Sequence, residues 1–420
     1  MQTRARDILL TLTRWSEGFL KTDITYLVQA GFWSNLNALI IAGFSFGLYV
    51  VYAHFLPKET YGTYQYLLSL FSIATAFTLT GMNTAVARAV AQGHEGTLRA
   101  SVRIQLRYGI IPFLGALIGA LYYFIAGNML LASGLLIIGI GTPMLYAYNS
   151  YGALFIGRKN FRSATAYGTV FNLIYYVALA GVATLSTDPL LLLATNLSVQ
   201  VIVLYTIYHV VLTREKPNDS VDPSALSYGM HLSALGVLGS VAGQVGSIFA
   251  FHFLGPVALA TFSFASALPD RLSNICFKFL GSATLARFSE RTAHEIRAQL
   301  IHKMLVAASA GLVLAVFYIS IAPLFFTLFF PAYLSAVPYS TLYAVGFVVS
   351  ASYFLPTTAL TALKRTHSLY VLSIVSSIFQ ICFPLIGMFY FQLWGLISGQ
   401  IGALLLSTIL ATILVYKAER

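Results

Sequence analysis

The chain is a succession of apolar stretches, separated by short segments that carry nearly all of its charge. A transmembrane α-helix needs about 20 mostly apolar residues to cross the hydrocarbon core of a bilayer. Charged residues make up only 9% of the chain, whereas a soluble domain carries about 25%. This composition excludes a water-soluble fold, a nucleic-acid-binding protein, a disordered chain and a disulfide scaffold. The sequence therefore predicts an all-α, polytopic integral membrane protein.

About twelve stretches meet this length requirement, six in each half of the chain. Residues 1–34 precede them and are predicted to form a cytoplasmic amphipathic lead-in, although a solvated segment is the alternative. Residues 35–213 are predicted to form an N-terminal six-helix lobe, residues 214–224 a cytoplasmic linker, and residues 225–420 a C-terminal six-helix lobe. The predicted spans cover residues 35–55, 63–87, 107–126, 129–156, 164–186, 189–212, 226–253, 257–282, 303–329, 336–361, 369–390 and 394–416.

The basic residues are distributed asymmetrically along these spans. With the N-terminus inside, all but three of the 24 Lys and Arg residues fall in cytoplasmic segments. Only Lys58 lies outside, and Arg271 and Lys278 lie within the eighth span. Because cytoplasmic loops carry an excess of Lys and Arg, both termini are predicted to be cytoplasmic. The net charge of +11 is thereby explained by topology rather than by a nucleic-acid partner.

A short pattern recurs in the two halves. His54-Phe55-Leu56 ends the first span and His252-Phe253-Leu254 ends the seventh. Gly81 to Arg88 closes the second span, and Gly281 to Arg287 closes the eighth. Such a parallel repeat predicts two pseudo-symmetric six-helix bundles around a central cavity. Chance similarity between apolar segments is the alternative.

The eighth span carries an unusual polar face. Asp270, Arg271, Asn274 and Lys278 fall within about 100° of arc on a helix. Charges inside a membrane are costly and usually face the bundle interior or water. Asp270 and Arg271 could instead neutralise each other structurally, and Lys278 could extend to the headgroups. If they line a cavity, these cations would attract a phosphate or pyrophosphate group.

Polar residues also occur in related spans. Gln65 and Asn83 share one face of the second span, Arg88 lies at its inner end, and Gln244 lies in the seventh. They suggest a hydrated lumen, although hydrogen bonds between neighbouring helices are the simpler interpretation for single Ser or Thr residues. The sequence has no Walker motif and no His/Cys cluster with metal spacing, so we expect neither an enzyme nor a cofactor.

Four segments carry a family resemblance: Phe55 to Tyr64, Gly81 to Arg88, Gly157 to Phe161, and Trp394 to Gly399. With them the chain resembles the Wzx-type polysaccharide flippases of the multidrug/oligosaccharidyl-lipid/polysaccharide exporter superfamily. The resemblance implies a multi-pass protein of the bacterial inner membrane. It implies transport of an undecaprenyl-pyrophosphate-linked oligosaccharide, such as an O-antigen (lipopolysaccharide), capsule or exopolysaccharide repeat unit, by alternating access.

The resemblance also implies an ion gradient, of protons or sodium, as the energy source. Membrane lipids, a polysaccharide polymerase and a chain-length regulator are the other implied partners. Many relatives place an acidic residue in the seventh span where this chain has Gln244, so Asp270 becomes the candidate for ion coupling. Twelve spans, rather than fourteen, argue against the peptidoglycan-precursor flippases.

These considerations give each candidate an expected role. The pyrophosphate is expected to contact cationic side chains, and the sugars are expected to contact amide side chains. The coupling ion is expected to bind Asp270, which would otherwise balance the charge of Arg271. The alternatives are a multidrug or toxin cation antiporter, which would want acidic residues in the lumen, and a non-transporting scaffold of a glycan assembly complex. The substrate-binding candidates are Arg271, Lys278, Arg88, Asn274, Gln65, Asn83 and Gln244.

Overall fold

The computed structural model describes residues 24–289 and 291–417, and each regular element within those ranges is a helix. The side chains of residues 24–32, 34–35, 235, 274–283 and 285–286 lie outside the described set, as do residues 1–23 of the predicted lead-in. The predicted all-α class is confirmed. The helices are α2 (Ile24–Phe55), α3 (Lys58–Ala76), α4 (Met82–Ala91), α5 (Thr97–Tyr108), α6 (Ile110–Ile125), α7 (Met129–Asn149), α8 (Tyr151–Gly157), α9 (Phe161–Leu185), α10 (Pro189–Glu215), α11 (Pro223–Phe249), η1 (Ala250–Leu254), α12 (Pro256–Ser289), α13 (Ala293–Phe329), η2 (Pro331–Ala336), α14 (Val337–Ala362) and α15 (Thr366–Lys417).

Nine helical segments of the described chain are long and apolar enough to cross a membrane. One of them, α15, has 52 residues and would be about 78 Å long if straight, more than twice the thickness of the hydrocarbon core. It breaks at Phe391 and Gln392, and Gly395 then packs against the main chain of Gly387. The chain therefore folds back and crosses twice. Two predicted spans are not among these nine segments. The second span corresponds to α3 and α4, and the eighth corresponds to α12; polar residues interrupt the apolar pattern in both.

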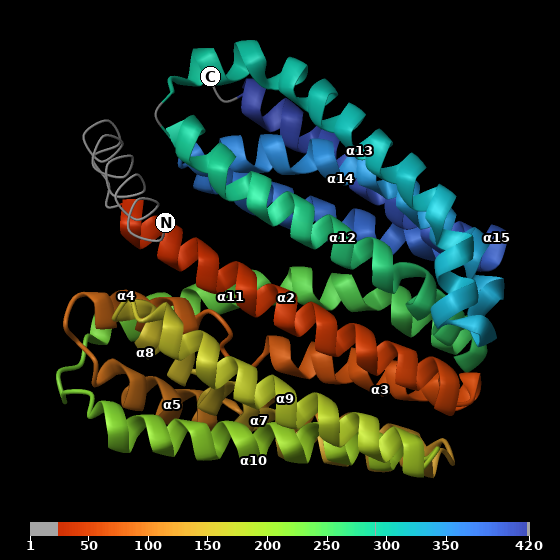
Figure 1. Ribbon diagram of the computed structural model, residues 1–420, viewed down its shortest axis with the longest axis horizontal. Coiled ribbons are helices and arrows are strands. Elements are labelled where there is room, and N and C mark those ends of the chain that lie inside the picture. Colours follow the sequence, from red (N-terminus) through yellow and green to blue (C-terminus); the bar gives the residue numbers. More distant parts are fainter. Residues whose placement is uncertain (1–23, 290, 418–420) are drawn as a thin grey trace, which may run out of the picture.

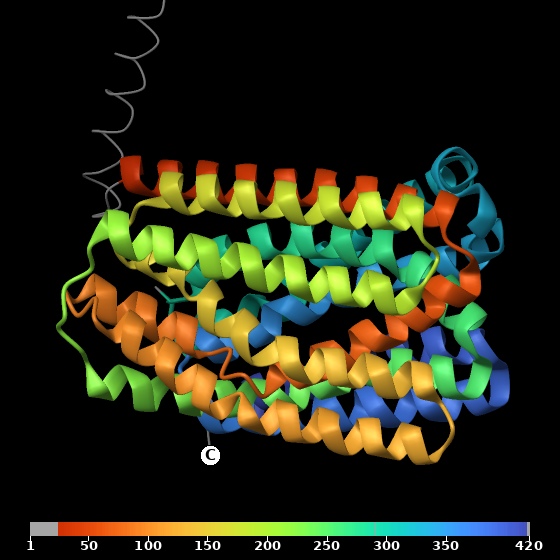
Figure 2. The ribbon, with the colours of Figure 1, turned by 90° about the horizontal axis from the view of Figure 1, so that it is seen from below.

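The helices are arranged as two lobes that lie beside each other (Figure 1). In the view turned by 90°, the helices of both lobes run roughly along the long axis of the molecule (Figure 2). We call the end that holds residues 216–222 the linker end, and the end that holds Pro57 and Gly255 the far end. The lobes approach each other at the far end and diverge toward the linker end, where α2 begins (Figure 1).

The far end of the interface between the lobes is closely packed. A Cβ atom on Gly62 of α3 would lie 1.9 Å from the carbonyl oxygen of Pro256 at the start of α12, so only glycine permits this approach. The buried rings of Tyr61 and Phe264 lie 4.9 Å apart, and those of Phe264 and Tyr333 lie 3.8 Å apart. Aromatic rings from both lobes therefore fill this end.

Helix α11 begins the second half of the chain but packs against the first lobe. It contacts α3, α4 and α5, as well as α15 of the second lobe. The backbone N–H of Gly81 donates to Ser233 Oγ at 3.0 Å, and Gly229 leaves room for Met82. Small residues on α11 thus allow α4 to approach closely, and α11 connects the two lobes.

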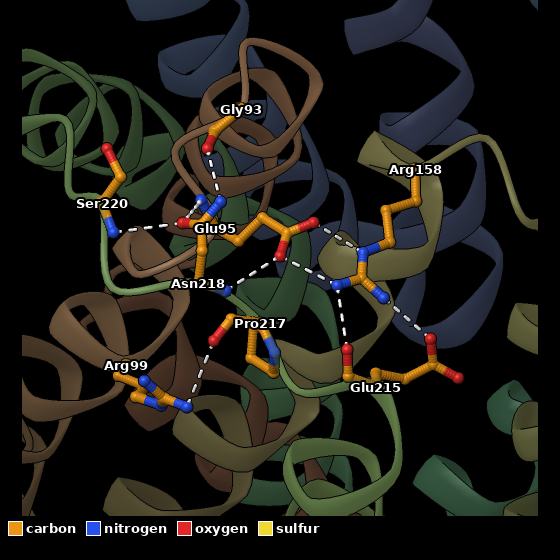
Figure 3. A network of polar contacts seen from close by, with 8 residues as sticks. All are labelled: Gly93, Glu95, Arg99, Arg158, Glu215, Pro217, Asn218 and Ser220. Atoms are coloured by element: carbon orange, nitrogen blue, oxygen red, sulfur yellow. Dashed lines mark hydrogen bonds and ion pairs between the residues drawn. The ribbon is translucent and has the colours of Figure 1, made fainter.

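The link between the lobes is held to the first lobe by a network around Arg158 (Figure 3). Arg158 Nε donates to Glu95 Oε1 at 2.6 Å, and its Nη1 donates to Glu215 Oε2 at 2.8 Å. The backbone N–H of Asn218 donates to Glu95 Oε2 at 3.0 Å. Hydrogen bonding to the Arg158 guanidinium lowers the pKa of the Glu95 carboxyl below its usual range. We call these four residues the linker clasp.

Candidate functional site

Helix α12 presents two consecutive charged residues to different neighbours. Successive residues on a helix point about 100° apart. Arg271 Nη1 donates to Ser45 Oγ of α2, and its guanidinium carbon lies 4.9 Å from the centre of the Tyr49 ring, also on α2. Arg271 therefore reaches from the second lobe to the first. It combines a hydrogen bond with a cation–π contact.

The two residues that Arg271 contacts belong to a group of aromatic and hydroxyl side chains. Ser45 is buried, Tyr49 meets Phe264 of α12 edge to face at 5.7 Å, and Phe44 stacks on Tyr176 of α9 at 6.0 Å. A guanidinium presents several N–H donors to phosphate oxygens, and aromatic rings offer apolar faces with polar edges. The arrangement is chemically suited to an anion with neighbouring hydroxyl groups.

Asp270 is exposed and faces a cavity of the second lobe. It lines a cavity of about 420 Å³ between α12, α14 and α15. The Tyr343 hydroxyl donates to Asp270 Oδ1 at 3.0 Å. Gln400, from the second arm of α15, also lines this cavity, and its Oε1 is buried without a hydrogen-bond partner among the described residues. A carboxylate, a hydroxyl and an amide oxygen around one cavity can hold a proton or a small cation.

Two amide candidates are engaged within the first lobe. Gln65 Nε2 donates to the Tyr61 hydroxyl of the same helix at 2.6 Å. Asn83 Oδ1 accepts a hydrogen bond from Ser150 Oγ at 2.8 Å, and Ser150 is itself buried. The structure therefore gives both amides partners inside the bundle.

The other candidates are spread along the molecule. Arg88 is exposed at the end of α4, with its guanidinium carbon 5.7 Å from the centre of the Tyr228 ring of α11. Gln244 is half-buried on α11. Asn274 and Lys278 lie on α12, but their side chains fall outside the described residues. Among the candidates whose side chains are described, Arg271 contacts α2 across the interface.

One polar centre was missed by sequence reasoning. Asn196 of α10 is 3% exposed and donates to the hydroxyls of Tyr64 at 2.7 Å and Tyr175 at 3.1 Å. It also accepts a hydrogen bond from Gln200 Nε2 at 2.6 Å. Two amides four residues apart in an apolar span were the available signal. Within the described ranges, no group of three His, Cys, Asp or Glu residues could hold a metal ion.

Comparison with known proteins gives a family match and several structural relatives. A family model described as polysaccharide biosynthesis protein matches residues 27–291. No curated protein shows significant sequence similarity to the chain. The structure resembles an inward-facing multidrug resistance MATE family transporter of the MOP superfamily, with a TM-score of 0.71 and 14% identity over 91% of this chain and 98% of that chain.

Two further solved structures have the same fold. An outward-facing MATE family transporter aligns with a TM-score of 0.65 and 15% identity, over 93% of this chain and 95% of that chain. A MOP superfamily transporter from Pyrococcus furiosus, described as having a binding pocket of reverse polarity that suggests a different function, aligns with a TM-score of 0.65, 14% identity and the same coverage. These structures confirm the predicted two-bundle fold, and the family match agrees with the predicted resemblance to polysaccharide flippases.

Proposed function

The chain belongs to the polysaccharide biosynthesis protein family, and on this premise we propose that it transports a lipid-linked oligosaccharide across the bacterial inner membrane. At the coarser level it is a multi-pass membrane transporter of the MOP superfamily. The proposed carrier is undecaprenyl pyrophosphate, and the cargo is an O-antigen, capsule or exopolysaccharide repeat unit. The asymmetry of Lys and Arg supports placing the linker end and both termini in the cytoplasm.

The observation that carries this proposal is the position of Arg271. A guanidinium that reaches Ser45 across the interface between the lobes favours an anion there and disfavours a cationic drug by simple Coulomb repulsion. A pyrophosphate is such an anion. The Pyrococcus furiosus relative, with its pocket of reverse polarity, is consistent with one fold serving cargoes of different charge.

The remaining candidates are assigned around this anion site. Lys278 would add a second cation on α12, and Arg88, at the linker end, would meet the pyrophosphate as it enters. Asn274 and Gln244 would hydrogen-bond sugars. Gln65 and Asn83 would do so only by exchanging Tyr61 and Ser150 for sugar hydroxyls.

The contrast between the two ends of the interface supports alternating access. The packed far end is closed in this state, whereas the lobes diverge toward the linker end (Figure 1). We assign the state as open to the cytoplasm. Asp270, in the cavity of the second lobe, would bind the coupling proton or sodium ion, and its place beside Arg271 on α12 would link ion binding to the cargo.

The test is charge removal at Arg271 in cells and in vesicles. Arg271→Gln is expected to reduce surface-glycan display at least tenfold and to accumulate lipid-linked oligosaccharide on the cytoplasmic leaflet. Arg271→Lys should retain part of the activity, because it keeps the charge but not the fork of donors. Arg162→Gln, which removes an exposed arginine at the linker end, is the matched control.

Three results would speak against the proposal. Full glycan display by Arg271→Gln would exclude an essential anion site. Efflux of cationic dyes by the wild type would favour the antiporter alternative. If Arg271→Gln causes loss of a glycan assembly complex without accumulation of the lipid-linked oligosaccharide, the scaffold alternative would be favoured.

A further inference from the structure

A second large cavity lies outside the site described above. It is a groove of about 830 Å³ on the second lobe, between α12, α13 and α14. Its walls include Val306, Leu314 and Phe317 of α13 and Leu355 of α14. Val306 and Phe317 are exposed, so the groove is open along the surface that faces lipid. An apolar groove of this kind accommodates a hydrocarbon chain.

Basic residues gather where the groove approaches the linker end. Arg287 from α12 and His302 and Lys303 from α13 line this part of the groove. The Lys303 ammonium lies 4.8 Å from the centre of the Phe288 ring, which holds it against α12. None of the described residues that line the groove is an Asp or Glu. Cations at one end and apolar walls beyond them match a lipid with a phosphate headgroup.

The groove is long enough to hold a hydrocarbon chain in an extended form. The lining residues of α13 run from His302 to Phe317, and the part from Lys303 to Phe317 rises about 21 Å along the helix. One leaflet is only about 15 Å deep, half of the hydrocarbon core. A lipid chain that follows the whole groove from a headgroup at Lys303 would therefore lie extended beside α13.

We infer that this groove binds the isoprenoid chain of the carrier lipid as it is loaded, with its phosphate first at Lys303 and Arg287 and only afterwards at Arg271, about 24 Å away along α12. The inference rests on the proposed function, since it assigns a place to the lipid portion of the same substrate. The groove and the Asp270 cavity share one wall, because Phe354 of α14 lines both. An occupant of the groove would thus contact the residue that borders the ion cavity.

The experiment measures binding of undecaprenyl monophosphate to the purified full-length protein by native mass spectrometry in detergent. The double variant Lys303→Gln/Arg287→Gln is expected to bind the probe about tenfold or more weakly, because it loses two charge-assisted contacts. Ala310→Phe, which fills the groove at an exposed lining position, should weaken binding without touching the charges. The controls are Arg103→Gln, an exposed arginine of the first lobe, and Leu312→Phe, an exposed residue of α13 outside the groove.

Competition with phosphatidylglycerol separates the two sources of a phosphate-bearing lipid. Equal binding and displacement by phosphatidylglycerol would overturn the assignment to an isoprenoid chain. Wild-type affinity in both the double variant and Ala310→Phe would overturn the groove as the site. A wild type that binds the probe there but translocates no oligosaccharide would contradict the proposed function alone, and translocation with no binding in the groove would contradict this inference alone.

Discussion

Asp270 and Arg271 adjoin in α12 but contact opposite lobes: Asp270 accepts a hydrogen bond from Tyr343 of the second lobe, whereas Arg271 donates to Ser45 of the first. Mutual neutralisation was one expectation for these neighbours. The structure gives each a polar partner of its own: the acid lines the cavity between α12, α14 and α15, and the base lies at the interface. The two charges can therefore serve different ligands.

Replacement of Asp270 should separate ion coupling from cargo binding. In proteoliposomes, Asp270→Asn is expected to abolish the stimulation of transport by a proton or sodium gradient, because the amide cannot take up a cation as the carboxylate does. Basal exchange of cargo should persist, unlike in Arg271→Gln. Tyr343→Phe, which removes only the hydrogen bond to Asp270, should retain partial stimulation. Undiminished stimulation in Asp270→Asn would exclude Asp270 as the coupling residue.

Removal of Arg158 should destabilise the protein. The variant Arg158→Ala leaves Glu95 and Glu215, whose side chains are 15% and 27% exposed, without their shared cation. We expect a loss of about 2 kcal/mol in the free energy of unfolding, since each carboxylate loses a charge-assisted hydrogen bond. Thermal unfolding in detergent measures this. Arg162→Ala, which removes an exposed arginine at the start of α9, should change the free energy of unfolding by no more than about 0.5 kcal/mol.

The linker clasp should also make stability depend on pH. The pKa of Glu95 is lowered in the folded state from its usual value of 4.5. Its contribution is therefore fully present above that value and is lost as the pH falls through the lowered folded pKa. Thermal unfolding followed between about pH 6 and pH 3 should show this decline in the wild type and a shallower one in Glu95→Gln. Glu59→Gln, at the far end, serves as the control, and an identical profile for Glu95→Gln would contradict the argument.

The contact between Gly62 and Pro256 should tolerate no side chain. Gly62→Val would force the main chains of α3 and α12 apart at the far end, because even a Cβ atom overlaps the Pro256 oxygen. We expect a lower unfolding temperature and reduced transport, corresponding to about 1–3 kcal/mol for an overpacked site. Gly47→Val on α2, where the added Cβ meets nothing within 4 Å, provides the comparison. Equal stability of the two variants would show that the lobes do not meet through Gly62.

The sequence was sufficient to predict the class of fold and most of the spans. Apolar length defines a membrane helix almost regardless of context, and a repeated pattern such as His54-Phe55-Leu56 survives because both copies end a span. Two predicted spans are not long and apolar enough to be among the nine segments: one is formed by α3 and α4, and the other is α12. Both were recognised in the sequence from their apolar residues. The polar face of α12 was also apparent from its periodicity.

The partners of individual side chains could not be predicted in the same way. Periodicity gives the direction of Asn83 relative to its own helix, but not that Ser150 stands opposite it. The linker clasp joins Arg158 to Glu95 and Glu215, residues 63 and 57 positions away, and no local pattern encodes such a meeting. The packing of α11 on the first lobe is likewise decided by tertiary contacts, because its position in the sequence places it in the second half of the chain.

The position of α11 bears on how the polypeptide assembles as it is made. Chains emerge from the ribosome N-terminal end first, and early units generally fold before later ones. The surfaces of α3, α4 and α5 that receive α11 are complete when α11 is inserted, whereas α15 has yet to be synthesised. The finished half thus offers a surface for the first helix of the unfinished half, and we expect α11 to dock on it before α15 is added.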